Sequence, residues 1–378
     1  MTTATRVSTN LSNAPAIARR LTAPPPAAIA AALGITQISI DWLAGDGSDR
    51  CYYRITAPEK RATYVLMQLS GSDLENLRSG SYDWVEIGDI LRNAGVVVPK
   101  ALTVLSEYGA LIIDDYGDEM LETTVLLADR KGSISDALPL YRRCLSTLSN
   151  FIAIRPEGNP SWTKRSFDAE RFIWELDFFV TKYLEGVCGR TLSSTEKLRF
   201  TQDSRALASF LASGSKYFVH RDFHSRNVMV WGGDIAVIDF QDARLGPVTY
   251  DLVSLCFDSY VPFSGRQRID LLDQGLELFG KRYGNPLLEE AKSQWKPLLL
   301  QRQLKAIGSF GYLTIDKDKG DYLKNVGPAL QTLLEANLSD SRWPFLSGEL
   351  LQVLAETLPV VQNRLNKPRT AQAALASS

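Results

Sequence analysis

The sequence has few of the residues that build metal clusters or disulfide frameworks. Only two histidines and four cysteines occur in 378 residues. The cysteines form no CxxC pair, which argues against a structural zinc site and against a secreted disulfide scaffold. We therefore expect a reducing, cytoplasmic setting. The cysteines are Cys51, Cys144, Cys188 and Cys256.

The sequence also lacks a large net charge and a long apolar run. It holds 42 basic and 43 acidic residues, so a nucleic-acid partner attracted by bulk positive charge is not indicated. No apolar run approaches the roughly 18 residues that a membrane span needs, and we expect no membrane association. With 45% hydrophobic residues, the chain can bury the core of one large or two modest domains. Small molecules are the expected partners, and a monomer is the simplest assembly.

The two ends differ in composition from the rest. The first forty residues contain Arg6, Arg19 and Arg20 but no acidic residue, a composition shared by organelle transit peptides and by ordinary flexible termini. We expect residues 1–35 to form a flexible leader, with structure beginning after the prolines at 24–26, and residues 366–378 to form a flexible tail.

Residues 38–116 have mainly the pattern of strands. Short runs rich in β-branched and aromatic residues alternate with Gly, Pro and charged turns. Residues 36–117 are therefore predicted to form a small β-rich lobe. The expected strands are Ile38–Leu43, Cys51–Thr56, Tyr64–Gln68, Ala101–Glu107 and Ala110–Asp114, with one helix at about Tyr82–Asn93.

Residues 118–365 have mainly the pattern of helices. Leu138, Tyr141, Leu145 and Leu148 recur at steps of three and four residues, which keeps one apolar face together. The same spacing recurs from Ile269 onward. The sequence thus predicts an α+β protein of two lobes, of which the helical one is the larger.

One run of loops and short strands, from His220 to Asp251, interrupts the helices. Two apolar runs around Gly232-Gly233 predict a β-hairpin, with Asn227 just before its first strand and Asp239 just after its second. Antiparallel pairing would bring their amide and carboxylate oxygens, the ligand types that Mg²⁺ prefers, near one another. With Asp222, this spacing matches the H-R-D-x-x-x-x-N loop and D-F-x segment of protein kinases, and it predicts phosphoryl transfer.

Both histidines of the chain lie in this loop. We expect His220 to brace the loop by hydrogen bonding. His224 stands where many protein kinases have lysine. It either contacts a phosphate or the acceptor, or it has no ligand contact. A hydrolase triad is disfavoured because the chain lacks a Gly-x-Ser-x-Gly turn.

The loop resembles that of the aminoglycoside phosphotransferase family, H-x-D-x-H-x-x-N. The residues that follow, Phe240-Gln241-Asp242, Gly246-Pro247 and Thr249-Tyr250-Asp251-Leu252, are more similar still to bacterial anomeric kinases of N-acetylmuramate and N-acetylglucosamine. This resemblance implies a protein-kinase-like fold, in which residues 36–117 bind nucleotide and residues 118–365 carry catalysis and substrate binding. It also implies an ATP-dependent, Mg²⁺-dependent kinase that makes a sugar 1-phosphate in cell-wall recycling.

The resemblance implies roles for individual residues. Asp222 is the expected catalytic carboxylate, Asn227 and Asp239 are the expected Mg²⁺ ligands, and Asp251 is expected to fix the loop backbone through hydrogen bonds. For an amino-sugar acceptor, the candidate contacts are His224, Glu175, Asp177, Gln241, Asp242 and Arg244, with Arg302 and Lys305 on a later helix as lesser candidates.

The nucleotide side has a weaker signature. No Walker A sequence occurs, and Gly45 to Arg50 predict either a phosphate-binding loop or an ordinary hairpin turn. Met67 replaces the usual phosphate-binding lysine, so Arg50 or Arg54 is expected to supply the charge, and Glu86 lies where the partner of that lysine would be. The predicted ATP contacts are Gly45, Gly47, Ser48 and Arg50 for the phosphates and Asp114 and Tyr116 for the adenine.

Two other interpretations remain. The acceptor could be an aminoglycoside, a choline-like alcohol or another metabolite, in which case a cationic acceptor needs a strongly acidic pocket. The missing lysine also allows a pseudokinase that only binds. A protein kinase is disfavoured, because Gln241 follows Asp239-Phe240 and no Ala-Pro-Glu closes an activation segment.

Overall fold

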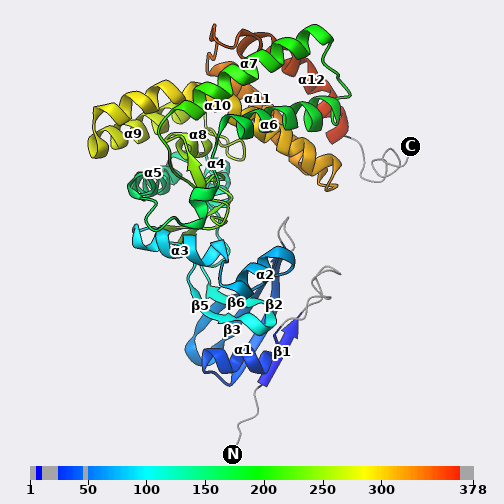
Figure 1. Ribbon diagram of the computed structural model, residues 1–378. Coiled ribbons are helices and arrows are strands. Elements are labelled where there is room, and N and C mark those ends of the chain that lie inside the picture. Colours follow the sequence, from blue (N-terminus) through cyan, green and yellow to red (C-terminus); the bar gives the residue numbers. More distant parts are fainter. Residues whose placement is uncertain (1–5, 11–23, 46–49, 367–378) are drawn as a thin grey trace, which may run out of the picture. The chain divides into compact units, whose positions relative to one another are not determined.

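The computed structural model describes residues 6–10, 24–45 and 50–366 of the chain (Figure 1). These fall into two compact units. The first unit lies within residues 1–119 and 229–242, and the second unit lies within residues 120–228 and 243–378. The chain therefore leaves the second unit once, for the segment 229–242, and returns to it.

The first unit is built on one six-stranded sheet in the order β1-β2-β3-β4-β6-β5. β1 pairs with β2 in parallel, and the remaining neighbours are antiparallel. The five strands predicted between residues 38 and 116 are all present. The strands are β1 (Arg6–Asn10), β2 (Gln37–Gly45), β3 (Cys51–Ala57), β4 (Ala62–Gln68), β5 (Ala101–Leu105) and β6 (Ala110–Asp114).

One face of this sheet is covered by helix α1 (Pro26–Leu33), which differs from the flexible leader expected there. Ile29, Ala30 and Leu33 are buried in a core with alternate residues of β3. The helix has its proline within the first turn and ends at Gly34, whose φ of 64° suits glycine. Helix α1 was not predicted because its alanines form no clear apolar stripe, although alanine favours helix.

Two helices follow β4: α2 (Gly71–Ser79) and α3 (Asp83–Asn93). The helix predicted at about 82–93 is confirmed as α3. Helix α2 was not predicted because its sequence has too few apolar residues to show a periodic face, and only Leu77 is buried. Short 3-10 turns lie at Pro58–Lys60 and Ser106–Tyr108.

The predicted hairpin is present as β8 (Val228–Trp231) and β9 (Asp234–Val237). Gly232 and Gly233 have φ angles of 58° and 79°, the left-handed conformation that a tight hairpin turn requires. Backbone bonds fix the hairpin within the first unit, from Val230 N–H to Glu119 O (2.8 Å) and from Val237 N–H to Val97 O (2.9 Å).

The second unit is mainly helical. Short antiparallel strands β7 (Tyr217–Val219) and β10 (Arg244–Gly246) flank the catalytic-loop sequence. Five further turns of 3-10 or π type lie at Ile134–Ala137, Ser161–Lys164, Val180–Glu185, Gly320–Asn325 and Phe345–Glu349. The helices are α4 (Leu121–Arg130), α5 (Leu138–Ala153), α6 (Ala169–Phe179), α7 (Ser194–Ser213), α8 (Tyr250–Cys256), α9 (Gly265–Tyr283), α10 (Asn285–Ile315), α11 (Val326–Glu335) and α12 (Leu350–Leu365).

Helix α10 is the longest element of the second unit, with 31 residues, and it packs closely against α6. Glycines permit this approach. A Cβ placed on Gly308 would lie 2.7 Å from Phe179 Cα, too close for any side chain. The same helix carries Arg302 and Lys305, so the fit of α6 on α10 sets where these two cations lie.

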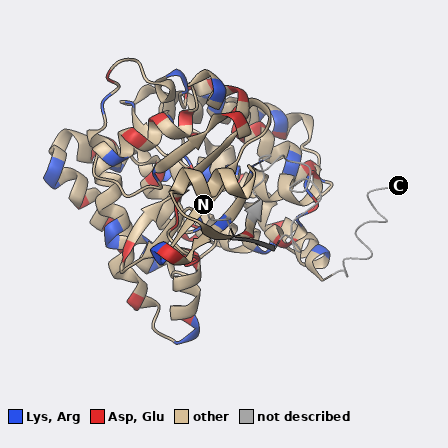
Figure 2. Ribbon diagram, turned by 90° about the horizontal axis from the view of Figure 1, so that it is seen from below, with Lys and Arg blue, Asp and Glu red and all other residues tan. Residues whose placement is uncertain are grey.

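No helix of the described residues is long and apolar enough to cross a bilayer. Basic and acidic residues are intermixed over the ribbon in Figure 2, in keeping with the formal net charge of -1.

Candidate active site

The loop that carries Asp222 is held by a buried carboxylate on α8. Asp251 accepts hydrogen bonds from the backbone N–H groups of His220 (2.6 Å) and Arg221 (3.0 Å). The expected role of Asp251 is thus confirmed. Burial raises the pKa of Asp251 to about 7, against the opposing effect of the two N–H donors. Arg221 adopts a φ of 86°, a costly conformation that these two bonds help to hold.

A second carboxylate anchors the far side of the loop. Asp258 accepts the backbone N–H of Ser225 (2.9 Å) and that of Tyr260 (2.8 Å). The segment around Asp258 is in turn held by Arg268, which is buried and donates to the backbone oxygens of Cys256, Asp258, Val261 and Phe263.

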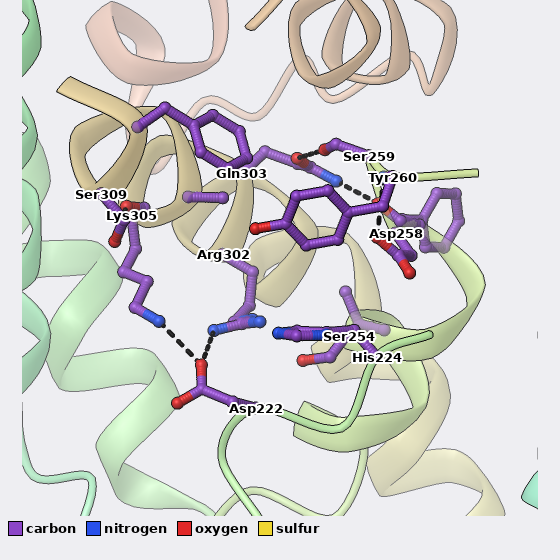
Figure 3. A pocket seen from close by; sticks show the side chains of 14 residues that line it. Asp222, His224, Ser254, Asp258, Ser259, Tyr260, Arg302, Gln303, Lys305 and Ser309 are labelled. Atoms are coloured by element: carbon purple, nitrogen blue, oxygen red, sulfur yellow. Dashed lines mark hydrogen bonds and ion pairs between the residues drawn. The ribbon is translucent and has the colours of Figure 1, made fainter. Parts of the chain in front are cut away.

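Asp222 lies against two cations of α10 (Figure 3). Its Oδ1 is 3.0 Å from Lys305 Nζ and 3.9 Å from Arg302 Nη1, while Oδ2 is 3.5 Å from Arg221 Nε. Burial acts to raise the pKa of Asp222, but the charges of Lys305, Arg221 and Arg302 outweigh it and hold that pKa well below its usual range. Asp222 is therefore a carboxylate at neutral pH.

Asp222, Arg302 and Lys305 line a pocket of about 160 Å³ in the second unit. Asp222, Arg302 and Lys305 lie on one side of it, and His224 and Tyr260 face them in Figure 3. Two carboxylates, Asp222 and Asp258, and two cations, Arg302 and Lys305, line it, so the fixed charges balance.

His224 is the predicted acceptor contact that does line this pocket. Its ring meets the edge of Tyr260 with centroids 5.4 Å apart, and its Nδ1 has no hydrogen-bond partner among the described residues. Burial lowers the pKa of His224, and the charges of Arg302 and Lys305 lower it further, against Asp258 and Asp222. A neutral imidazole can both donate and accept a hydrogen bond. The other histidine, His220, is fully buried and stacks with Phe151.

Three other predicted acceptor residues of the second unit do not line the pocket. Glu175 is 0% exposed and accepts a hydrogen bond of 2.7 Å from Gln301, within the contact of α6 with α10. Asp177 is exposed on α6. Arg244 lies over the ring of Phe167, 5.1 Å from its centroid. Their binding roles remain predictions.

The two predicted Mg²⁺ ligands belong to different units. In the second unit, Asn227 donates from Nδ2 to Asp222 O (2.8 Å). The amide oxygen of Asn227 therefore points away from Asp222 O, and such an oxygen is a hard ligand suited to Mg²⁺. In the first unit, Asp239 has a φ of 64° and accepts from Gln241 Nε2 (2.8 Å). Both side chains offer the oxygen donors that Mg²⁺ takes, and the pairing remains a prediction.

The predicted nucleotide contacts all belong to the first unit. Gly45 ends β2, and Gly47 and Ser48 lie outside the described residues. Asp114 ends β6 and accepts the Lys100 N–H (2.9 Å), and the Tyr116 hydroxyl donates to Val98 O (3.4 Å). Asp242 is half-buried in the same unit, and Gln241 is buried. Arg50 is paired with Asp73 of α2.

Arg302 and Lys305, which lie beside Asp222, were only lesser candidates from the sequence. Their i, i+3 spacing on one helix placed them on one face, which was a usable signal. What it could not show is that this face meets Asp222, since Lys305 is 83 residues away along the chain.

A model of the phosphotransferase enzyme family matches residues 41–287. The chain belongs to this family. The match includes the Asp222 loop, the hairpin and Asp251, whereas Arg302 and Lys305 follow its last residue. The family resemblance drawn from the loop is confirmed.

Among curated relatives, this phosphotransferase is similar to two proteins named N-acetylmuramate/N-acetylglucosamine kinase. The one from Neisseria meningitidis serogroup B is 27% identical over 230 residues, which cover 60% of this chain and 66% of that protein. The one from Pseudomonas aeruginosa is 29% identical over 281 residues, which cover 72% and 78%.

Solved structures similar to this phosphotransferase confirm the predicted fold class. The gentamicin complex of APH(2")-IIa aligns with a TM-score of 0.53 at 16% identity, over 81% of this chain and 95% of that one. A choline/ethanolamine kinase family protein from Mesorhizobium loti aligns with a TM-score of 0.51 at 12% identity, over 90% and 96%. The phosphotransferase thus has the α+β, protein-kinase-like fold of these enzymes.

Proposed function

We propose that this phosphotransferase transfers the γ-phosphoryl group of ATP to the anomeric hydroxyl of an amino sugar, N-acetylmuramate or N-acetylglucosamine. The product is the sugar 1-phosphate. The observation that carries the proposal is the ionised carboxylate of Asp222 at a pocket whose fixed charges, Asp222 included, are balanced. A cytoplasmic enzyme of cell-wall recycling, acting on small molecules without a partner chain, is part of the same proposal.

Asp222 is suited to orient an acceptor hydroxyl. Phosphoryl transfer requires mainly that the attacking oxygen is aligned and that negative charge is offset. A carboxylate with a lowered pKa is a weak base, so Asp222 acts first by accepting the hydrogen bond of the hydroxyl and fixing its direction. As the O–P bond forms and the bond from the γ-phosphorus to the β–γ bridging oxygen breaks, the proton passes to Asp222 and ADP leaves.

Residues of this chain also fit the remaining tasks. Asn227 and Asp239 would hold Mg²⁺, which offsets the charge of the phosphates when it is bound. Lys305 and Arg302 keep Asp222 ionised and add positive charge on the acceptor side. His224, neutral at physiological pH, would contact the sugar.

The charge balance of the pocket favours an uncharged or anionic acceptor over a cationic one. An aminoglycoside or choline needs surplus carboxylates to replace its water shell. Here Arg302 and Lys305 offset Asp222 and Asp258, and Asp258 already accepts backbone hydrogen bonds. The names of the curated relatives, amino-sugar kinases, agree with this preference.

The test is ATP consumption with a panel of acceptors, followed by phosphorus NMR of the product. N-acetylmuramate and N-acetylglucosamine should be turned over and should give an anomeric phosphate signal. The methyl glycoside of N-acetylglucosamine is the matched control, because its anomeric oxygen is blocked. A 6-phosphate product, or turnover of the methyl glycoside, would refute the anomeric assignment. Turnover of choline or an aminoglycoside alone would mean that this compound, and not an amino sugar, is the acceptor. ATP binding without any turnover would favour a pseudokinase.

A further inference from the structure

The pocket beside Asp222 is also lined by a tyrosine, Tyr260, whose hydroxyl group makes no hydrogen bond within the described residues. Figure 3 shows this hydroxyl on the side of the ring that faces α10, with Arg302 and Lys305. A polar group that lines a cavity and has no protein partner can bond a ligand. We call this cavity the acceptor pocket, since the proposed function puts the sugar there.

The ring of Tyr260 is fixed by its neighbours. Its backbone N–H donates to Asp258 Oδ1 (2.8 Å), and the guanidinium group of Arg226 lies over the ring, with Cζ 3.7 Å from the centroid. Arg226 is itself held by Glu122 through two hydrogen bonds of 2.9 and 2.8 Å. His224 makes an edge contact with the same ring. The hydroxyl therefore has a defined position, which a contact that selects among ligands requires.

The hydroxyl of Tyr260 is a neutral hydrogen-bond donor. Burial raises the pKa of Tyr260 above its ordinary value, against the charge of Arg226, so the phenol stays protonated at neutral pH. The two carboxylates that line the pocket are engaged: Asp222 is paired with Lys305, and Asp258 accepts backbone N–H groups. The pocket thus suits an uncharged group that accepts a hydrogen bond better than it suits a free ammonium group.

The proposed reaction brings such a group into the acceptor pocket. In a hexosamine, the carbon that bears the nitrogen is bonded directly to the anomeric carbon. When the anomeric hydroxyl lies against Asp222, the nitrogen substituent must therefore lie close by. In its acetylated form this substituent has a carbonyl oxygen, which accepts a hydrogen bond, and a methyl group, which favours apolar surroundings. Apolar side chains of Val253, Phe257 and Phe310 line the same pocket as Tyr260.

We infer that Tyr260 is a specificity-determining residue, whose hydroxyl donates a hydrogen bond to the carbonyl oxygen of the acetamido group and so selects N-acetylated over free amino sugars. A site built to hydrogen-bond one group of its substrate rejects an analogue that lacks this group, because the polar side chain is then left unpaired. This inference rests on the proposed function, since it takes the anomeric hydroxyl at Asp222 as the attacking group.

The experiment changes the enzyme and the acceptor together. Steady-state kinetics of the full chain are measured with N-acetylglucosamine and with 2-deoxyglucose, which has no substituent at the same carbon and is also followed as a competitor of N-acetylglucosamine. Tyr260→Phe removes the hydroxyl and keeps the ring. It should lower kcat/KM for N-acetylglucosamine by roughly tenfold, which corresponds to one neutral hydrogen bond. The loss should appear in KM, because this bond is made before and during the reaction alike.

The same variant should leave kcat/KM and the competition constant for 2-deoxyglucose unchanged. Tyr312→Phe is the matched control, because Tyr312 lies on α10 and does not line the pocket. It should change the kinetics with neither sugar. The wild-type chain supplies a second measurement that needs no variant: it should favour N-acetylglucosamine over glucosamine, whose amine is charged at neutral pH, by roughly tenfold or more.

The outcomes separate this inference from the proposed function. Thermal unfolding checks that each variant folds. Unchanged kinetics of Tyr260→Phe with N-acetylglucosamine, or an equal loss with 2-deoxyglucose, overturns the role of Tyr260 while the proposed function stands. Equal or better turnover of glucosamine by the wild-type chain overturns the selectivity in the same way. A wild-type chain that phosphorylates neither N-acetylglucosamine nor N-acetylmuramate overturns both proposals.

Discussion

Lys305 Nζ lies 3.0 Å from Asp222 Oδ1, so the carboxylate expected to orient the acceptor is already paired with a cation of α10. Arg302, one turn before Lys305 on the same helix, lies 3.9 Å from the same oxygen and also donates to the Tyr250 hydroxyl (2.9 Å). The two cations thus differ in how firmly each is engaged with Asp222. Lys305 makes the shorter contact, so removing Lys305 should change the pKa of Asp222 more than removing Arg302.

Replacing Asp222 tests the acceptor-orienting role directly. Asp222→Asn should abolish turnover, because an amide neither takes a proton nor fixes the hydroxyl in the same way, while ATP affinity and the folded state persist. Steady-state kinetics and nucleotide titration measure the two properties separately. Asp129→Asn, an exposed position on α4, is the matched control. Wild-type turnover by the Asp222→Asn variant would contradict the acceptor-orienting role of Asp222.

Replacing Lys305 should shift the pH dependence of kcat/KM. The pKa of Asp222 is lowered in the folded chain, so Asp222 stays ionised until the pH falls below the usual range of an aspartate. Lys305→Met removes the largest charge that opposes burial, and the acid limb of the profile should then move to higher pH. Lys305→Arg keeps the positive charge, so its acid limb should lie close to that of the unchanged protein. Lys292→Met, exposed on the same helix, should leave the profile unchanged. A purely structural lysine would lower the rate at every pH without moving the limb.

Replacing Asp251 should destabilise the second unit. The side chain receives two backbone N–H groups of the catalytic loop, and Asp251→Leu leaves both donors buried without an acceptor. The expected loss is about 1–3 kcal/mol in the free energy of unfolding for each unsatisfied donor. Urea titration followed by circular dichroism measures it. Asp270→Leu, exposed on α9, should change stability little. Equal stability of the two variants would contradict the anchoring role.

Replacing Arg54 should affect the binding of adenosine as well as that of ATP. Arg54→Gln frees Asp115 and Asp118, which belong to the segment after β6, from their contact with β3, so the expected adenine contact loses its support. Calorimetric titration with the two ligands should therefore show similar losses. A loss confined to ATP would mean that Arg54, not Arg50, binds the phosphates.

The contact between α6 and α10 can be tested with a single methyl group. Gly308→Ala places a Cβ 2.7 Å from Phe179 Cα and should cost about 1–3 kcal/mol of stability, because backbone cannot move aside as a flexible side chain can. In Gly327→Ala, on α11, the added Cβ meets nothing within 4 Å, so this variant should be neutral or slightly stabilised. Gly308→Ala should also lower turnover, since α10 carries Lys305.

Much of the fold could be predicted from the sequence because its signals are local. Alternation of apolar and polar residues indicates the strands of the first unit, and a 3.6-residue period indicates the long helices of the second. Helices α1 and α2 were missed because alanines or polar residues fill them, and their few buried side chains become visible only against the sheet or loops they cover.

The sequence by itself determined the chemistry of the loop: Asp222, Asn227 and the Gly-Gly hairpin follow one another in a fixed order, and spacing within one short segment is readable without a fold. It also determined that Met67 is no phosphate ligand. Only the tertiary structure decided that Lys305 meets Asp222, that Glu175 is buried in a helix contact, and that Arg54 binds Asp115. The reason is physical. Contacts between distant segments depend on how helices and strands pack, and no local pattern encodes which face of α10 will lie against a loop 83 residues earlier.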